Sequence, residues 1–160
     1  MMERGSTAIV TGGGKRVGEV IARALVDDGW TVIAHVHREE DPVPEGASRV
    51  VADLAEADCA ERIFAASAGK PPVRLLVNNA ARFAYDAFGR ADADEFDAHM
   101  HVNARAPMLL SDEFFSRHTG GDALIVNMLD AKLSAPNPDY LSYTLSKYAL
   151  AGLTELAARA

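Results

Sequence analysis

Three consecutive glycines, Gly12–Gly14, lie between a short apolar segment and an amphipathic one, and this arrangement limits the possible folds most. The apolar segment Thr7–Val10 has the length of a buried strand, and the apolar residues after the turn recur at helical spacing as far as Asp27. A second apolar segment, Trp30–Val36, follows. Strand, glycine-rich turn, helix and strand make up a βαβ unit. We therefore expect an α/β fold with a parallel sheet covered by helices.

The rest of the chain continues this alternation. Two amphipathic segments, Ala55–Ala68 and Asp92–His118, predict helices, and Pro107 is expected to kink the second or to lie near a bend. By contrast, Asp41–Ala47 contains two prolines and a glycine and predicts a connection without a helix. No repeat or domain boundary interrupts the pattern, so we expect one domain over residues 1–160 with a doubly wound parallel sheet. The remaining strands are predicted at Arg49–Ala52, Val73–Val77 and Ala123–Met128.

The glycine-rich turn suits a phosphate group. Glycines let the backbone approach a ligand, and the helix that follows presents free N–H groups and the positive end of its dipole. A pyrophosphate fits there, although a merely flexible turn is the alternative. Basic residues in the turn and around the end of the second strand favour a 2′-phosphate, and hence NADP(H) over NAD(H); the acidic residues 39–41 weaken this preference, and a solvated basic edge is the alternative. The basic cluster consists of Lys15, Arg16, His35, His37 and Arg38.

Tyr143 and Lys147 lie four residues apart in the helical stretch Tyr140–Ala160. Residues at this spacing share one face of a helix, so we expect the phenol and the ammonium to meet. The ammonium is expected to lower the pKa of Tyr143 towards neutral pH, which suits a general acid or base. The alternative is an aromatic residue packed on a helix with a lysine extending past it. Asn103, polar within the apolar face of the preceding helix, is either a satisfied structural group or holds a water against Lys147.

Polar residues also follow two of the predicted strands. Asn78 and Asn79 come directly after the fourth strand, where they can bond backbone carbonyls and nucleotide edges at the sheet edge that binds ligands in open α/β folds. Asp53 follows the third strand and either accepts from an adenine amine or caps the next helix. Phe83 lies in the loop after the asparagines and either covers the core or contacts a ligand.

Composition excludes several classes of function. The formal charge is −7 and the basic residues are dispersed, which argues against nucleic acid as the main partner. The single cysteine, Cys59, excludes an internal disulfide and lies among acidic residues that disfavour a thiolate. No metal site is expected, because His99 and His101 point to different faces of a helix and no Cys/His cluster has ligand spacing. No segment is apolar for long enough to span a bilayer, and we expect a cytoplasmic protein.

Four motifs occur in the order and at roughly the spacing found in short-chain dehydrogenases/reductases, and the resemblance covers essentially the whole chain. They are Thr11-Gly12-x-x-x-Arg16-x-Gly18, Asn78-Asn79-Ala80, Asn103 and Tyr143-x-x-x-Lys147. The resemblance implies a Rossmann-type sheet in which Tyr143 is the general acid/base, Lys147 lowers its pKa and binds the nicotinamide ribose, and Asn103 anchors a water. The implied cofactor-binding residues are Gly12, Lys15, Arg16, Val17, Gly18, His35, His37, Arg38, Asp53, Leu54, Asn79, Ala80, Ala81, Tyr143 and Lys147.

The chain departs from the family pattern at three positions. Arg16 replaces the middle glycine of the turn, Asp130 replaces the serine found thirteen residues before the tyrosine, and Ala81 ends the usual Asn-Asn-Ala-Gly. The first two departures resemble the pteridine reductase branch, in which an aromatic residue at the place of Phe83 stacks on the pterin. A carboxylate can accept in bidentate fashion from the amidine-like edge of a pterin; a capping carboxylate in a diverged or inactive member is the alternative. The implied substrate-binding residues are Arg16, Phe83, Asp130 and Tyr143.

The sequence thus predicts NADPH-dependent hydride transfer to a pterin- or dihydrofolate-like ring, with Tyr143 as proton donor. The alternatives are a short-chain reductase of a carbonyl compound and a non-catalytic nucleotide-binding fragment. The family continues beyond the Tyr143 helix with two more strands and a substrate-binding loop, whereas this chain stops at Ala160, so we expect the domain to be incomplete at its C-terminus. The resemblance of the two long helices to the family's dimer surface implies a homodimer or homotetramer for a full-length chain.

Overall fold

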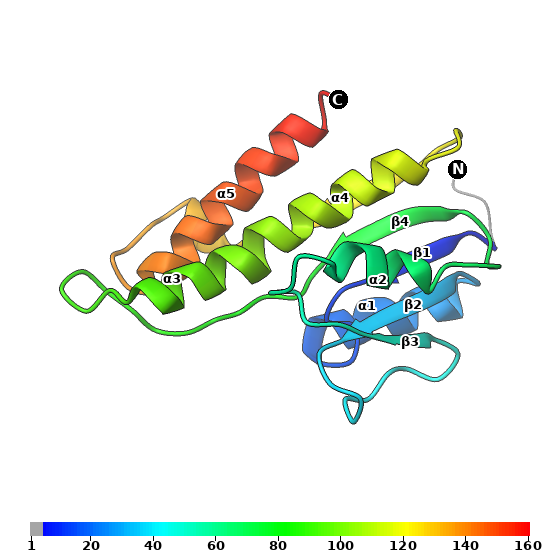
Figure 1. Ribbon diagram of the computed structural model, residues 1–160, viewed down its shortest axis with the longest axis horizontal. Coiled ribbons are helices and arrows are strands. Elements are labelled where there is room, and N and C mark those ends of the chain that lie inside the picture. The colour runs from blue at the N-terminus through cyan, green and yellow to red at the C-terminus, as the bar shows by residue number, and fades with distance from the viewer. Residues whose placement is uncertain (1–4) are drawn as a thin grey trace.

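Five parallel strands form one sheet in the order β3-β2-β1-β4-β5 (Figure 1). The computed structural model describes residues 5–160, so positions 1–4 of the predicted domain lie outside the described residues. The chain runs outward from β1 through β2 and β3 and returns to the other side of β1 with β4, which confirms the doubly wound sheet. The strands are β1 (Thr7–Val10), β2 (Thr31–Val36), β3 (Ser48–Val51), β4 (Val73–Asn78) and β5 (Leu124–Asn127).

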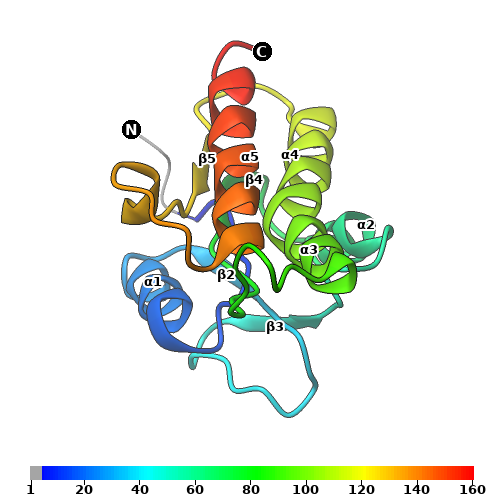
Figure 2. The ribbon, with the colours of Figure 1, turned by 90° about the vertical axis from the view of Figure 1, so that its left-hand side faces the viewer.

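Alternation along the strands sends apolar side chains to both faces of the sheet. Three helices cover these faces: α1 (Arg16–Asp27), α2 (Cys59–Ala65) and α4 (Ala106–Arg117). Ala8 and Val10 of β1 pack with α1, whereas Ile9 between them packs with α2 and α4. Figure 2 shows α1 on one side of the sheet and α2 and α4 on the other. The central strands β1, β2 and β4 are therefore largely buried, as a parallel sheet requires, whereas the edge strands β3 and β5 are partly exposed.

The long helix predicted over 92–118 is present as one rod with an irregular middle (Figure 1). It consists of α3 (Ala93–Met100), a π-helical turn (His101–Arg105) and α4. Pro107 lies in the first turn of α4, just after the wider π turn. A proline cannot donate the hydrogen bond that a continuous α-helix needs at this point, and the π turn absorbs the defect. The expected irregularity near Pro107 is therefore the turn that carries Asn103.

The segment after β3 differs from its prediction. The side chain of Asp53 accepts from the N–H of Ala55 at 2.8 Å, and this turn delays the helix, so that α2 begins at Cys59 rather than at Ala55. The predicted start of this helix was wrong because a short acidic side chain competes with the helix for backbone N–H groups. The connection between β2 and β3, by contrast, contains no helix, as predicted.

After β5 the chain passes through a 3₁₀ turn (Ala131–Leu133) into α5 (Leu141–Ala157), which packs beside α3 and the π turn. Tyr140 precedes α5 in the left-handed conformation, with φ of +56°. In the part of the chain from residue 5 onward, no helix has the length and apolar character needed to cross a membrane.

Candidate active site

The candidate site begins where the chain leaves β1 and β4, the two neighbours at which the strand order reverses. Asn79 joins these strand ends, because its Nδ2 donates to the carbonyl oxygens of Thr11 at 2.9 Å and Gly12 at 3.3 Å. The hydroxyl oxygen of Thr11 accepts in return from the backbone N–H groups of Asn79 and Ala80, both at 3.0 Å. The predicted bonding of backbone carbonyls by the asparagines is confirmed for Asn79.

The glycine-rich turn is packed too closely to admit side chains. A Cβ atom at Gly18 would lie 2.1 Å from the carbonyl oxygen of Gly12 and 2.4 Å from Asn79 Nδ2, and Gly12 itself has a φ of +64°. The first turn of α1 therefore lies directly against the glycine turn, and its free N–H groups form an anion site of the kind that binds phosphates. Arg16, an exposed residue at the start of α1, adopts a φ of +51°, which is costly for any residue except glycine.

The ring of His35 supports the turn from below. Its Nδ1 accepts from the N–H of Gly12 at 3.2 Å, its Nε2 donates to the carbonyl of Ala52 at 3.0 Å, and its own carbonyl accepts from Gly13 at 2.9 Å. Burial lowers its pKa, so the ring is neutral near pH 7. Because both ring nitrogens are engaged by the backbone, the prediction that His35 contacts a phosphate is wrong.

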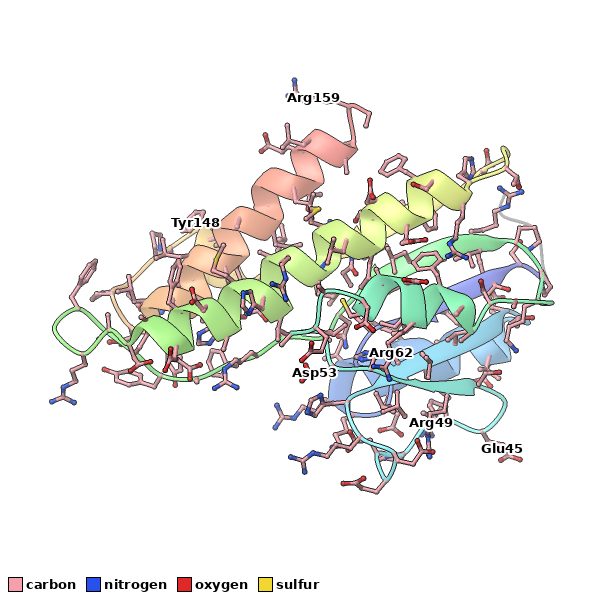
Figure 3. All side chains as sticks on the ribbon, in the orientation of Figure 1. Glu45, Arg49, Asp53, Arg62, Tyr148 and Arg159 are labelled. Atoms are coloured by element: carbon pink, nitrogen blue, oxygen red, sulfur yellow. The ribbon has the colours of Figure 1, made fainter. Side chains whose placement is uncertain are left out.

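A cavity of about 500 Å³ lies over this edge of the sheet. Lys15 at its rim forms an ion pair with Asp41, whereas His37 and Arg38 are exposed. Asp53, labelled in Figure 3 at the turn that leaves β3, caps that turn and not the helix, because α2 begins at Cys59 with Asp58 as its N-cap; the predicted capping of the next helix is therefore wrong. Asp53 also lines the cavity, and its predicted bond to an adenine amine stays a prediction. The predicted cofactor residues in the cavity wall are Gly12, Lys15, His35, His37, Asp53, Leu54, Ala80 and Ala81.

Tyr143 and Asp130 meet at the other end of the site. The hydroxyl of Tyr143 donates to Oδ2 of Asp130 at 2.7 Å, and the other carboxylate oxygen accepts from the N–H of Lys132 at 2.8 Å. Burial and then the Asp130 carboxylate raise the pKa of Tyr143 above its ordinary value, while the hydrogen bond from Tyr143 lowers the pKa of Asp130. The predicted fall in the pKa of Tyr143 is therefore wrong for the site in this state, because a carboxylate stabilises the protonated phenol.

Lys147 lies on the same face of α5 as Tyr143, as its spacing predicts, but it does not reach the hydroxyl. Its Nζ donates to the carbonyl oxygen of Met128 at 2.7 Å and lies 5.8 Å from the centroid of the Tyr143 ring. Burial lowers the pKa of Lys147, and the nearby Asp130 carboxylate opposes this effect. The amine is thus held close enough to stabilise a phenolate once one forms, without contacting the phenol directly.

Asn103 anchors the loop that follows β4. Its Oδ1 accepts from the N–H of Arg82 at 2.8 Å, and its Nδ2 donates to the carbonyl of Arg82 at 3.0 Å and to Oγ of Ser146 at 2.9 Å. The side chain is fully buried and its polar atoms are satisfied. Of the two predicted roles, the structural one is observed, and the water contact to Lys147 stays a prediction.

Aromatic rings fill the space beside the Tyr143 hydroxyl. The ring of Phe83 stacks on Tyr140, with centroids 4.4 Å apart and planes 12° apart, and meets the edge of Tyr143 at 4.7 Å. Phe83 is still 60% exposed, so it does not cover the core. Of the two predicted roles, covering the core is therefore wrong, and contact with a ligand stays a prediction.

Sequence reasoning missed three buried residues that fix the start of α5. The Asp86 carboxylate accepts from the N–H of Ser142 at 3.0 and 3.1 Å, and Oγ of Ser142 lies 2.9 Å from Nδ1 of His99. These partners are 56 and 43 positions apart in the chain, so no local spacing reveals them. The one signal in the sequence is a histidine within the α3 segment. Within residues 5–160 no cluster of His, Cys, Asp or Glu could hold a metal ion.

Comparison with known proteins places this geometry in a family. Residues 6–160 match the family model described as short chain dehydrogenase. Pteridine reductase 1 of Leishmania tarentolae is 32% identical over 94% of the chain and 70% of its own length. L-xylulose reductase of Bos taurus is 33% identical over 96% of the chain and 65% of its own length.

The fold gives the same result. The crystal structure of FolM alternative dihydrofolate reductase 1 from Brucella canis, complexed with NADP, superimposes with a TM-score of 0.88 at 32% identity, over 96% of this chain and 67% of that one. The chain spans about two thirds of the length of these relatives. The backbone fold is accordingly shared with that structure over almost the whole of this chain.

Proposed function

We propose, since the chain belongs to the short-chain dehydrogenase family, that this oxidoreductase transfers a hydride from NADPH to a pterin-like ring. The observation that carries the proposal is the meeting of three groups. The Tyr143 hydroxyl lies 2.7 Å from the Asp130 carboxylate, and the Phe83 ring lies 4.7 Å from the Tyr143 ring. A proton donor, a bidentate acceptor and an apolar planar surface are what a flat heterocycle with an amidine edge requires.

Asp130 orients the substrate in this proposal. Its two oxygens already accept from two separate donors, the Tyr143 hydroxyl and the Lys132 N–H. An amidine edge likewise offers two N–H groups side by side, and a carboxylate accepts such a pair in bidentate fashion. A ketone offers no donor to this carboxylate, so Asp130 favours a nitrogen heterocycle.

Tyr143 supplies the proton. Burial and Asp130 keep its pKa above the ordinary value, so the phenol is protonated at neutral pH and can act as a general acid. When bound, NADPH supplies the hydride that adds to the carbon of a C=N bond. Tyr143 gives its proton to the nitrogen of that bond, and the ammonium of Lys147, 5.8 Å from the Tyr143 ring, stabilises the phenolate that remains.

The residues of the turn fit a nicotinamide dinucleotide. Gly18 and Gly12 clear the approach to the N-terminus of α1, and the cavity of about 500 Å³ continues from there over the sheet edge. The related Brucella canis protein was solved with NADP, which supports the same cofactor here. The proposed cofactor residues are Gly12, Lys15, Arg16, Val17, Gly18, His37, Arg38, Asp53, Leu54, Asn79, Ala80, Ala81, Tyr143 and Lys147.

Replacement of Tyr143 by phenylalanine tests the proposal. We expect oxidation of NADPH with a dihydropterin to fall by about 10³-fold, because general acid catalysis typically supplies factors of this size. NADPH binding, measured by isothermal titration, is expected to change little. Tyr148→Phe is the matched control, since Tyr148 is a half-exposed tyrosine on the same helix (Figure 3) whose hydroxyl donates only to Leu133 at 3.3 Å. Unchanged turnover in Tyr143→Phe would refute the assigned role.

A carbonyl substrate is the second candidate, because L-xylulose reductase of Bos taurus is 33% identical to this chain and pteridine reductase 1 is 32% identical. Rates with dihydropterin and dihydrofolate, compared with rates for a panel of ketones and ketoses, separate the two. Nucleotide binding without turnover of any of these substrates would instead indicate a binding module.

We also propose a homo-oligomer. Met108 and Phe115 on α4 and Leu145 on α5 are all more than two fifths exposed, and these helices correspond to the surface that short-chain dehydrogenases use between subunits. The native mass of the protein tests this. The single cysteine, Cys59, is buried and free, which fits a cytoplasmic setting.

A further inference from the structure

Lys15 is the only basic residue of the predicted phosphate cluster whose side chain forms an ion pair with an acidic residue among residues 5–160. It forms an ion pair with Asp41, which lies in the connection between β2 and β3. The Lys15 side chain is 64% exposed, whereas that of Asp41 is only 13% exposed. The second carboxylate oxygen of Asp41 accepts from the backbone N–H of Arg38 at 3.1 Å. Asp41 is therefore held from two sides, while its lysine partner reaches out from the turn.

The connection that carries Asp41 is fixed directly on the glycine turn. A Cβ atom at Gly14 would lie 2.1 Å from the carbonyl oxygen of Pro42 and 2.9 Å from Cγ1 of Val36. This contact requires glycine at position 14 and places the residue before Pro42 beside the rim of the cavity. In Figure 3 the same connection is the loop that carries the labelled Glu45 and leads into β3, where Arg49 is labelled. The position of Asp41 is thus set by backbone packing and not by the ion pair alone.

Lys15, His37 and Asp41 all line the one cavity in which the adenosine half of the cofactor is proposed to lie. A carboxylate on a lysine is chemically similar to a phosphate on a lysine, because both place anionic oxygens on the ammonium. We infer that Asp41 is a built-in competitor for the 2′-phosphate of NADPH, so that the nucleotide must displace Asp41 from Lys15 before the phosphate can be bound. This inference rests on the proposed function.

The consequence is a weakened preference for NADPH over NADH. The 2′-phosphate of NADPH is attracted by the basic cluster. To bind there it must break the Lys15–Asp41 ion pair and lie near the negative charge of Asp41. NADH carries only a hydroxyl at this position and meets neither obstacle. Asp41 is accordingly a specificity-determining residue that acts against the cations around it.

Asp41→Asn removes the charge and keeps an oxygen that can accept from the Arg38 N–H. We expect it to tighten NADPH binding about two- to fivefold, the range that corresponds to removal of an ion pair near the surface. NADH binding is expected to change less than twofold. Both are measured by isothermal titration of the purified protein, and 2′,5′-ADP against 5′-AMP gives the same comparison without the nicotinamide. Asp41→Ser is the second variant, because a serine cannot bridge to Lys15 as an asparagine amide can.

Glu40→Gln is the matched control. It makes the same change in charge at the adjacent, exposed position, whereas the ion pair of Lys15 is with Asp41. We expect it to change NADPH binding less than twofold. Equal tightening in Glu40→Gln and Asp41→Asn would overturn the inference, because the effect would then be one of net charge. Weaker NADPH binding in Asp41→Asn would also overturn it, since Asp41 would then position Lys15.

The outcome also distinguishes the inference from the proposed function. If the unmodified protein binds NADPH and both Asp41 variants bind it equally well, only the inference fails. If the unmodified protein binds neither NADPH nor NADH, the proposed function fails as well.

Discussion

Two carboxylates, one at each end of the site, accept from side-chain donors that differ in their exposure to solvent. At the glycine turn, Asp41 contacts Lys15, whose side chain is 64% exposed. At the end of β5, Asp130 accepts from Tyr143, which is 6% exposed. Water and salt screen the first pair, so a ligand can exchange with it at small cost. In the second pair the Tyr143 side is buried while Asp130 is half-buried, and the carboxylate helps to keep the proton on the phenol.

The glycine turn and the catalytic end of the site also differ in the atoms that shape them. The glycine turn is shaped by backbone atoms, with Gly18 lying against Gly12 and the turn amides held by His35. The catalytic end is shaped by side chains, with Tyr143, Asp130 and the Phe83 ring in mutual contact. Substitutions at the turn should therefore act through shape and cofactor binding, whereas those at the catalytic end should act through protonation and turnover.

Gly18→Ala is the strongest test of the shape-defined end. The added Cβ would lie 2.1 Å from the carbonyl oxygen of Gly12, so backbone must move. We expect a loss of about 3 kcal/mol in the free energy of unfolding, measured by urea denaturation, together with loss of NADPH binding.

Gly152→Ala is the matched control, because Gly152 lies within α5 and nothing stands within 4 Å of its Cβ position. There the same change is expected to stabilise the helix by about 1 kcal/mol. If the two variants behaved alike, the turn would not be the close-packed element described above.

Asp130→Asn tests the end defined by protonation. Without the carboxylate charge the pKa of Tyr143 falls, and the bidentate acceptor is lost. We expect turnover at neutral pH to drop by about tenfold to a hundredfold while NADPH binding is kept. The alkaline limb of the pH–rate profile should move to lower pH, because the phenolate forms earlier. Asp139→Asn, an exposed change in the same loop, should alter neither quantity.

Stability should change with pH in a defined direction. The pKa of Tyr143 is raised above its ordinary 10.0 in the folded state, so its contribution is complete below pH 10 and is lost as pH rises through the folded value. The pKa of Asp130 is lowered from 3.8, so its contribution is present above that value and is lost as pH falls through the folded value. Asp130→Asn should reduce the first dependence and abolish the second. Unfolding curves between pH 3 and 11 that match those of the unmodified protein would contradict the coupling.

The sequence predicted the backbone-defined end better than the side-chain-defined end. The glycines between the first strand and the first helix predicted the turn, and the four-residue spacing of Tyr143 and Lys147 predicted that they share one face of a helix. The direction of Lys147 towards Met128 was not predictable, because it depends on where β5 ends relative to α5. The role of His35 was predicted wrongly, because the sequence of an apolar strand does not show whether a histidine ring bonds a ligand or the backbone. Contacts between distant positions, such as Asp86 with Ser142, leave no local pattern.

The smallest expected effect on stability concerns Arg16, which begins α1, and Tyr140, which precedes α5. Arg16 at α1 has a φ of +51° and Tyr140 at α5 has a φ of +56°, the left-handed region that favours glycine. Arg16→Gly should raise the free energy of unfolding by about 1 kcal/mol, because the strain is relieved and the exposed side chain makes no compensating contact in the described chain. Tyr140→Gly should give no such gain, because it removes the ring that stacks on Phe83 at 4.4 Å. Urea denaturation of both variants measures the difference. A gain in Tyr140→Gly equal to that in Arg16→Gly would mean that the aromatic contact contributes nothing to stability, and that the catalytic end is no more dependent on its side chains than the turn is.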